Sequence, residues 1–218
     1  MMANNEKQIK SKKRVADHGE VFTSEREVNS MLDLVYHEAE RIESRFLEPA
    51  CGTGNFLIEI YSRKLHEVEK KYKKSQTDFE KYAFLSTSSI YGIDLMPDNI
   101  AECKKRLLDK FMEIYKVIYK SKCKKEFFEV IDYILSKNLL VGDALTLLQE
   151  NGNPIIFPEW NFVRGSMVKR RDYIYKELIK EDENSYTEKS IENKKAFIPE
   201  PILEFPMVHY MKVVEYEK

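Results

Sequence analysis

Apolar residues recur every three or four positions across residues 24–42, which is the spacing of one face of an amphipathic helix. Ser24 and Glu27 open this segment with the spacing of a capping box, in which each side chain satisfies a backbone N–H at the start of a helix. We therefore expect an N-terminal helix whose buried face carries Val28, Met31, Leu32, Val35, Ala39 and Ile42.

Three short apolar runs follow, at residues 46–48, 89–94 and 139–141, and longer helical patterns separate them. The helical patterns start at Gly54 and at Pro97, a residue that suits the first turn of a helix. Residues 73–88 are expected to form a connecting loop or a short helix. The β-α-β-α-β order predicts an α/β fold, a doubly wound, Rossmann-like sheet that is largely parallel.

The pattern changes after residue 150. Residues 155–163 and 167–175 are typical of strands, and residues 164–166 between them predict a hairpin turn. Residues 181–195 are polar, and the proline-containing run 197–214 is expected to pack back in an extended form. We thus divide the chain into a flexible basic N-terminus (1–17), a central domain (18–150), a β-hairpin extension (151–180), and a linker with a C-terminal extended segment (181–218).

The composition fits one domain with appendages: 218 residues, of which 43% are hydrophobic and 33% charged. No run approaches the roughly 20 apolar residues that span a bilayer, and the N-terminus lacks the apolar core of a signal peptide. The three cysteines show no C-x-x-C spacing. We therefore expect a cytoplasmic protein with no membrane contact, no disulfide framework and no metal site.

The net charge is −1, but the basic residues are clustered at positions 7–14, 70–74 and 120–125. Such clusters can follow a phosphate backbone, although a lysine-rich solvated surface is the simpler interpretation. A pI near 6.5 does not indicate that this chain alone binds a duplex strongly.

The most informative segment is the apolar run that ends at Glu48, because a turn with Gly52 and Gly54 follows it and Asn55 opens a helix. Such a turn places a ligand against backbone N–H groups. A dinucleotide-binding fingerprint would need a third glycine where Leu57 stands. Glu48 would also repel a phosphate, whereas it suits a cationic amine such as that of S-adenosylmethionine.

Residues 48–57, E-P-A-C-G-T-G-N-F-L, resemble the first motif of S-adenosylmethionine-dependent methyltransferases, in the form used by DNA adenine-N6 enzymes of restriction-modification systems. Residues 92–95 (G-I-D-L) and 142–145 (G-D-A-L) resemble the second and third motifs. The resemblance implies that Asp94 accepts hydrogen bonds from both ribose hydroxyls and that Asp143 accepts one from the adenine amine. It places Glu48 near the amino-acid end of the cofactor.

Residues 18–23, H-G-E-V-F-T, resemble the N-terminal motif of the γ-type enzymes, whose Phe-Thr-Pro turn closes over the methionine end of the cofactor. Ser24 stands where that family usually has proline. The order of the motifs along the chain also favours the γ class. The expected cofactor-binding residues are Phe22, Thr23, Glu48, Pro49, Ala50, Cys51, Gly52, Gly54, Asn55, Phe56, Asp94, Leu95, Asp143 and Ala144.

The resemblance covers residues 17–147 and lacks the catalytic motif, Asn/Asp-Pro-Pro followed by an aromatic residue, which binds the target adenine. Residues 153–156 (N-P-I-I) lack the second proline and the aromatic ring, and residues 157–160 (F-P-E-W) have a different arrangement. We therefore assign no catalytic residue. Either the chain is a truncated or split enzyme, completed by a protein partner that supplies catalysis and DNA recognition, or it binds the cofactor without catalysis. The three retained acids favour the first interpretation.

Other functions remain open at the level of sequence. The chain could be a methyltransferase for RNA, protein or a small molecule, or a non-catalytic regulatory subunit, whereas the missing glycine disfavours an NAD-linked oxidoreductase. In the predicted hairpin, residues 169–171 (K-R-R), Trp160 and Tyr173 are candidate contacts for a nucleic acid or a partner. The ordinary charged edge of a hairpin explains them equally well.

Overall fold

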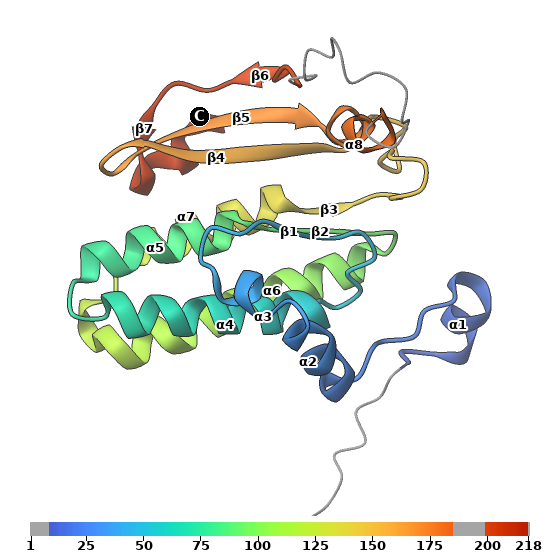
Figure 1. Cartoon of the computed structure of the whole chain (residues 1–218), viewed down its shortest axis with the longest axis horizontal. Coiled ribbons are helices and arrows are strands. Elements are labelled where there is room, and N and C mark those ends of the chain that lie inside the picture. The colour runs from blue at the N-terminus through green and yellow to red at the C-terminus, as the bar shows by residue number, and fades with distance from the viewer. Residues whose placement is uncertain (1–8, 185–198, 218) are drawn as a thin grey trace, which may run out of the picture.

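The protein was analysed as a computed structural model, which describes residues 9–184 and 199–217. A layer of helices, a parallel sheet and an antiparallel sheet lie one above another (Figure 1). A short N-terminal arm projects beside the carboxyl ends of the parallel strands. Among the described residues, no helix has the length and apolar character needed to cross a membrane.

The parallel sheet contains β1 (Phe46–Glu48), β2 (Ile90–Asp94) and β3 (Leu139–Val141), in the spatial order β1-β2-β3. Glu48 pairs with Gly92, and Asp94 pairs with Val141, so the carboxyl ends of the three strands lie side by side. The three predicted strands, their parallel arrangement and the α/β class are confirmed.

The helices α4 (Asn55–Tyr72), α5 (Gln76–Ser88), α6 (Pro97–Tyr119) and α7 (Lys125–Asn138) form one layer below this sheet (Figure 1). The strands are ordered as in the sequence, so two right-handed crossovers place their helices on the same face. The antiparallel sheet covers the opposite face. Helix α5 occupies most of the region expected to be a loop or short helix, because burial of Phe79, Ala83 and Phe84 stabilises 13 helical residues.

The antiparallel sheet is built on the predicted hairpin, with β4 (Ile156–Arg164) paired to β5 (Met167–Ile174) and Gly165 in the turn at φ +58°. Strands β6 (Leu203–Glu204) and β7 (Val208–His209) add to β5, so the C-terminal segment packs back on the sheet, but only the part before residue 210 is extended as expected. It ends in the 3₁₀ helix η2 (Tyr210–Glu217). Helix α8 (Tyr175–Asn184) replaces the expected start of the linker, and the rest of that linker lies outside the described residues.

The N-terminal region differs from its prediction in two respects. The expected single helix is divided into α2 (Glu25–Asp33) and α3 (Tyr36–Glu40), because Val35 leaves the helical conformation at φ −117°. The Ser24–Glu27 capping box is present, but Met31 and Val35 are exposed. An additional helix, α1 (Lys12–His18), begins at Ser11, whose side chain accepts a hydrogen bond from a backbone N–H of the first turn.

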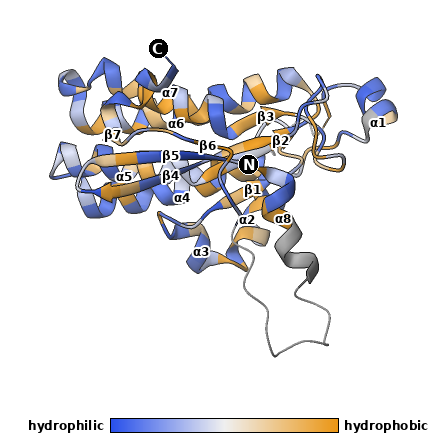
Figure 2. Ribbon diagram, turned by 90° about the horizontal axis from the view of Figure 1, so that it is seen from above, coloured by the Kyte–Doolittle hydropathy of each residue, from blue (hydrophilic) through white to orange (hydrophobic). Residues whose placement is uncertain are grey.

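Apolar residues form the clusters between the layers. In the view from above, strand β3 is hydrophobic along its length (Figure 2). Tyr91 and Ile93 of β2 pack against Phe157 of β4 on the hairpin side of the parallel sheet. On the helix side, a Cβ on Gly92 would lie 2.9 Å from Leu57, so the glycine allows α4 to approach the strand closely.

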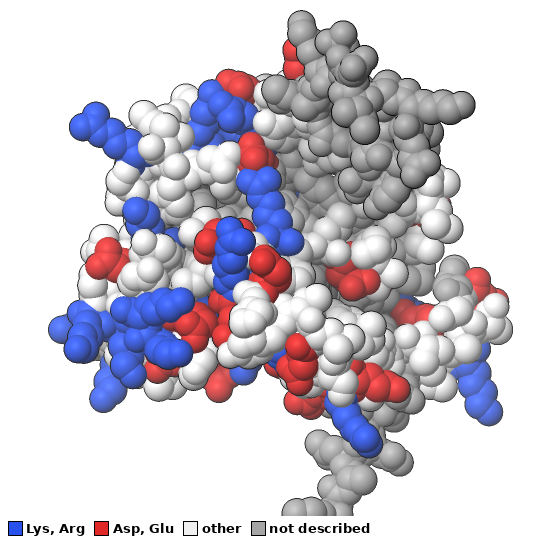
Figure 3. All heavy atoms as spheres, viewed as in Figure 1, with Lys and Arg blue, Asp and Glu red and all other residues white. Residues whose placement is uncertain are grey.

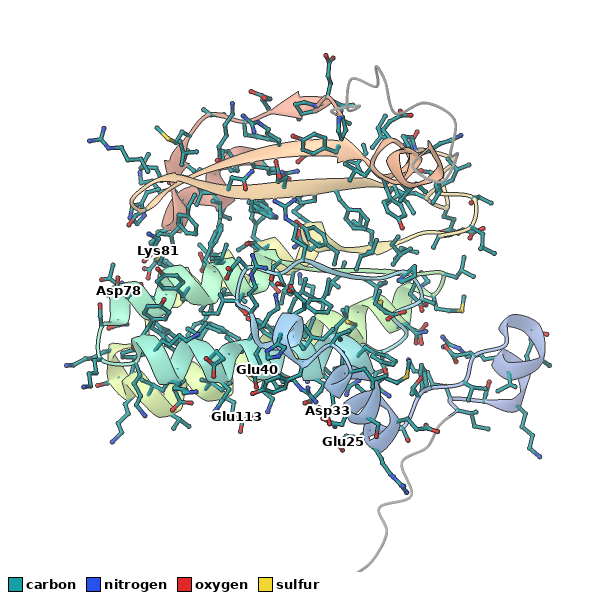
Figure 4. The ribbon with its side chains drawn as sticks, viewed as in Figure 1. Glu25, Asp33, Glu40, Asp78, Lys81 and Glu113 are labelled. Atoms are coloured by element: carbon teal, nitrogen blue, oxygen red, sulfur yellow. The ribbon has the colours of Figure 1, made fainter. Side chains whose placement is uncertain are left out.

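The side chains proposed as hairpin contacts for a nucleic acid make internal contacts. Trp160 is buried, and its indole N–H donates a hydrogen bond to the side-chain oxygen of Asn138. Arg170 pairs with Asp172 inside the protein, whereas Lys169 and Arg171 both pair with Glu204 of β6. From the helical layer, Lys81 points toward the hairpin, with its Nζ 5.2 Å from the centroid of the Phe162 ring (Figure 4). The expectation that Trp160 offers stacking surface is therefore wrong.

Lys64, a buried lysine of α4, bonds this helix to the segment that precedes β1. The Nζ of Lys64 donates hydrogen bonds to the carbonyl oxygens of Ile42 and Ser44 and to the hydroxyl of Ser89. Burial lowers the pKa of Lys64 to about 7.

We expect Lys64→Met to lower the free energy of unfolding by about 2–4 kcal/mol at neutral pH, because two buried carbonyls lose their donor. The unfolded chain keeps an ordinary lysine pKa, so above pH 7 it binds more protons than the folded chain. The stability of the wild type therefore rises with pH relative to the variant, by about 2 kcal/mol between pH 7 and pH 9. Urea unfolding at both pH values measures this gap. A pH-independent gap would show that Lys64 titrates normally.

Candidate functional site

The turn between β1 and α4 requires both of its glycines. Gly52 and Gly54 have left-handed backbone angles, with φ of +52° and +86°. A Cβ on Gly52 would lie 2.9 Å from the Phe22 ring, and one on Gly54 would lie 2.5 Å from the Cys103 sulfur. The Phe22 ring thus lies directly against the glycine turn.

Hydrogen bonds from three directions hold this turn. The Gly52 N–H donates to Asp94 Oδ2 at 2.9 Å. Arg106 of α6 donates to the Thr53 carbonyl oxygen at 2.7 Å and to the Asn55 side-chain oxygen at 2.8 Å. The Asn55 amide donates in turn to the Thr23 carbonyl oxygen, also at 2.8 Å. Strand β2, helix α6 and the N-terminal segment are therefore fixed around one loop.

Asp94 joins the end of β2 to the helix that follows it. Its Oδ1 accepts hydrogen bonds from the Met96 N–H at 2.8 Å and from the Asn99 amide at 3.0 Å. The same amide nitrogen of Asn99 also donates to Glu20 Oε1 at 2.7 Å. A carboxylate of the N-terminal segment is thereby connected to the predicted ligand-binding acid.

A cavity of about 450 Å³ lies at the carboxyl ends of the parallel strands. The N-terminal segment, the glycine turn and the loops after β2 and β3 surround it. Its lining contains three carboxylates and neither Lys nor Arg among the described residues. The lining residues are Gly19, Glu20, Val21, Phe22, Pro49, Ala50, Gly52, Asp94, Leu95, Met96, Asn99, Gly142, Asp143, Ala144 and Leu145.

Eight of the fourteen predicted cofactor-binding residues line this cavity: Phe22, Pro49, Ala50, Gly52, Asp94, Leu95, Asp143 and Ala144. The other six lie close by without lining it. Asn55 lines a neighbouring cavity of about 690 Å³ on the other side of Phe22. Phe56 packs into an apolar cluster with Val28 and Leu32.

The remaining four predicted residues support the turn. Cys51 is buried, and its N–H donates to the Ile93 carbonyl oxygen at 2.8 Å, which extends the pairing of β1 with β2. Gly54 lies against α6, and the Thr23 carbonyl accepts from Asn55. Glu48 ends β1 and is partly buried. Their positions indicate roles in shaping the site.

The two acids at the outer strands have different environments. Burial raises the pKa of Glu48, although a hydrogen bond from the backbone of Ala50 opposes this effect. The N–H of Leu145 donates to Asp143 and lowers the pKa of that carboxyl. Asp143 is therefore ionised at neutral pH and available as a hydrogen-bond acceptor.

Three further residues belong to this site but were not predicted: Glu20, Asn99 and Arg106. Glu20 lies inside the H-G-E-V-F-T segment, and Asn99 follows Asp94 by five positions, so both were close to recognised motifs. Arg106 gave no sequence signal, because it reaches the glycine turn only through the packing of α6 beside α4.

The chemistry of the cavity fits one kind of ligand better than others. Among the described residues only one of the three carboxylates, Glu20, pairs with a cation, Arg14, so together they repel a phosphate, which disfavours a dinucleotide. They suit a ligand that donates hydrogen bonds and carries positive charge, such as a cationic nucleoside. Leu95 and Leu145, with exposed fractions of 54% and 94%, provide apolar surface for a flat ring. S-adenosylmethionine has all of these properties.

The fold is that of an α/β domain compatible with the Rossmann-like methyltransferase class. The chain belongs to the MmeI DNA-methyltransferase domain family, which matches residues 10–150, more than half of its length. It is thus a DNA methyltransferase domain of the restriction-modification type. No curated protein and no solved structure matches the chain.

The matched region ends before the hairpin, and the hairpin does not provide a catalytic motif. The N-P-I-I segment (153–156) leads into β4, and Pro154, which precedes that strand, forms an isolated bridge with Leu148. In the F-P-E-W segment (157–160), Phe157 and Trp160 are buried in the core. Neither segment lines the cavity at the strand ends. The described residues also contain no group of three or more His, Cys, Asp or Glu that could hold a metal ion.

Two of the three basic clusters, at residues 70–74 and 120–125, lie away from this cavity, whereas Arg14 of the first cluster pairs with Glu20 in the cavity lining. The Tyr119 hydroxyl donates to the Lys73 carbonyl oxygen at 3.1 Å, so the cluster after α4 and the cluster after α6 are neighbours. Lys and Arg side chains gather at that end of the helical layer, at the left in Figure 3, opposite the carboxyl ends of the strands. Lys70 and Lys71 pair with Glu67. This arrangement favours a solvated surface over a DNA path into the site.

Proposed function

We propose that this chain binds S-adenosylmethionine in the cavity at the strand ends and supplies the cofactor-binding part of a DNA adenine-N6 methyltransferase. The main support is the convergence of the glycine turn, Asp94 and Asp143 on one cavity that lacks basic side chains. The family match supports the DNA methyltransferase class. The adenine-N6 target rests on the sequence motifs.

The residues of the cavity have distinct tasks in this proposal. Asp94 accepts a hydrogen bond from a ribose hydroxyl, and Asp143 accepts one from the adenine amine. The adenine ring lies between Leu95 and Leu145, which exclude water from its faces. Phe22 covers the glycine turn and holds the methionine end in place. The bound cofactor supplies an electrophilic methyl group, and the chain contributes orientation and desolvation.

We further propose that a protein partner supplies the target-adenine pocket and sequence recognition. Residues 1–218 contain no Asn-Pro-Pro-aromatic motif. In the described structure β1 is an edge strand, whereas cofactor-binding doubly wound sheets have strands on both sides of the first strand. Leu47 in β1 has an exposed fraction of 37% and lines an apolar cavity of about 470 Å³. The second candidate function, a regulatory subunit that binds the cofactor without catalysis, is favoured by the missing motif alone.

The test uses S-adenosylmethionine labelled in its methyl group, with DNA, RNA and protein as acceptors. We expect N6-methyladenine in DNA only when the chain is combined with the product of an adjacent reading frame that encodes an Asn-Pro-Pro-Tyr segment. Label in RNA or protein would contradict the DNA target. Cofactor binding without transfer, in the presence of such a partner, would establish the regulatory alternative.

A further inference from the structure

The carboxylate of Asp94 has too few free lone pairs in its own plane to accept hydrogen bonds from both ribose hydroxyls. A carboxylate has about four lone-pair sites, two on each oxygen. Two protein donors, the Met96 N–H and the Asn99 amide, already occupy Oδ1, and the Gly52 N–H occupies one site of Oδ2. One acceptor site is left, although a ribose presents two neighbouring hydroxyl groups. A second acceptor is therefore needed on the wall of the cavity.

Glu20 has an acceptor in the right place. Its side chain is nine-tenths buried, with an exposed fraction of 10%. Its Oε1 accepts from Asn99 at 2.7 Å and from Arg14 at 2.7 Å. Its Oε2 is buried and has no hydrogen-bond partner among the described residues. Leaving a charged oxygen buried and unpaired is costly, so a ligand that donates a hydrogen bond to Oε2 would be bound more tightly.

The carboxylates of Glu20 and Asp94 are held next to each other by one shared hydrogen-bond donor. The single amide nitrogen of Asn99 donates to Glu20 Oε1 and to Asp94 Oδ1, so it holds the two carboxylates beside each other. Both side chains also line the cavity at the strand ends. We propose that Glu20 Oε2 accepts a hydrogen bond from one ribose hydroxyl of the cofactor, while Asp94 accepts one from the other. This inference rests on the proposed cofactor site and adds a specificity-determining residue to it.

The structure also explains how a residue from a terminal arm is positioned accurately. Arg14 bonds to Glu20 and, at 2.6 Å, to Asp98 at the start of α6. Lys10 pairs with Asp98 at 3.0 Å and with Glu102 at 2.8 Å. These contacts fix the N-terminal segment to α6, the helix that also carries Asn99. The segment thus forms one wall of the nucleoside site.

The test measures the affinities of S-adenosylhomocysteine and its 2′-deoxy and 3′-deoxy analogues by calorimetry. We expect Glu20→Gln to weaken S-adenosylhomocysteine binding about tenfold, because the amide keeps the Asn99 contact and removes the free acceptor. The decisive measurement is whether the effect of removing a ribose hydroxyl depends on the presence of the Glu20 carboxylate. In the wild type each missing hydroxyl lowers the affinity about tenfold, whereas in the variant one of the two analogues binds as well as the parent compound.

Glu129→Gln is the matched control, because Glu129 pairs with Lys125 on the exposed surface of α7 and does not line this cavity; its affinities should equal those of the wild type. Thermal unfolding establishes that each variant is folded. Unchanged affinity in Glu20→Gln, or equal losses for both analogues in the variant and the wild type, would overturn the inference. A wild-type chain that does not bind S-adenosylhomocysteine would instead contradict the proposed function.

Discussion

Gly52→Val should reduce cofactor affinity by more than about 100-fold. Gly52 lies at φ +52°, a conformation that a β-branched residue adopts only with strain, and the new Cβ would lie 2.9 Å from the Phe22 ring. The ring must then move, and both residues line the cavity. The N–H contact with Asp94 would be disturbed as well. Calorimetric titration with S-adenosylhomocysteine measures the loss.

Gly152→Val provides the control for backbone strain. Gly152 also has a left-handed conformation, at φ +79°, but no atom lies within 4 Å of its added Cβ, and it does not line the cavity. This variant should lose stability and keep wild-type affinity. Wild-type affinity in folded Gly52→Val would refute the role of the glycine turn.

Asp94→Ala should weaken cofactor binding by about 1–3 kcal/mol, or roughly 5- to 150-fold, because a ribose hydroxyl loses its acceptor. The variant should also unfold at a lower urea concentration. The substitution leaves the N–H groups of Gly52 and Met96 and the amide of Asn99 without their shared acceptor. Titration of the folded variant separates the affinity from the stability.

Asp132→Ala serves as the comparison, because Asp132 makes a partly exposed ion pair with Lys104 that links α7 to α6, and neither residue lines the cavity. Exposed pairs of this kind contribute about 0–1 kcal/mol, so neither affinity nor stability should change much. Unchanged cofactor affinity in Asp94→Ala would remove the ribose assignment of Asp94.

The sequence predicted those parts of the site that depend on local pattern. Short apolar runs that end in Glu48, Asp94 and Asp143 identify three parallel strands, because the order of strands and helices dictates which strand ends meet. The left-handed conformations of Gly52 and Gly54 likewise follow from the turn in which they stand. Eight of the expected cofactor residues consequently line one cavity.

The features that were missed depend on contacts between segments that are distant in sequence. Helix α5 has little periodic pattern, since both its apolar and its small polar residues are buried between neighbouring elements. The apparent role of Trp160 as exposed stacking surface failed because Asn138 accepts its N–H inside the core. Glu20 reaches Asn99, 79 positions away, only after the N-terminal segment packs on α6. No local pattern encodes such contacts.

Titration of the wild-type chain with S-adenosylhomocysteine and with NAD⁺ tests the central claim most directly. The account predicts one S-adenosylhomocysteine site per chain and no measurable binding of NAD⁺, because the carboxylates of Glu20, Asp94 and Asp143 in the cavity lining accept hydrogen bonds from a nucleoside and repel a pyrophosphate. Failure of the folded chain to bind S-adenosylhomocysteine, or preference for NAD⁺, would contradict it.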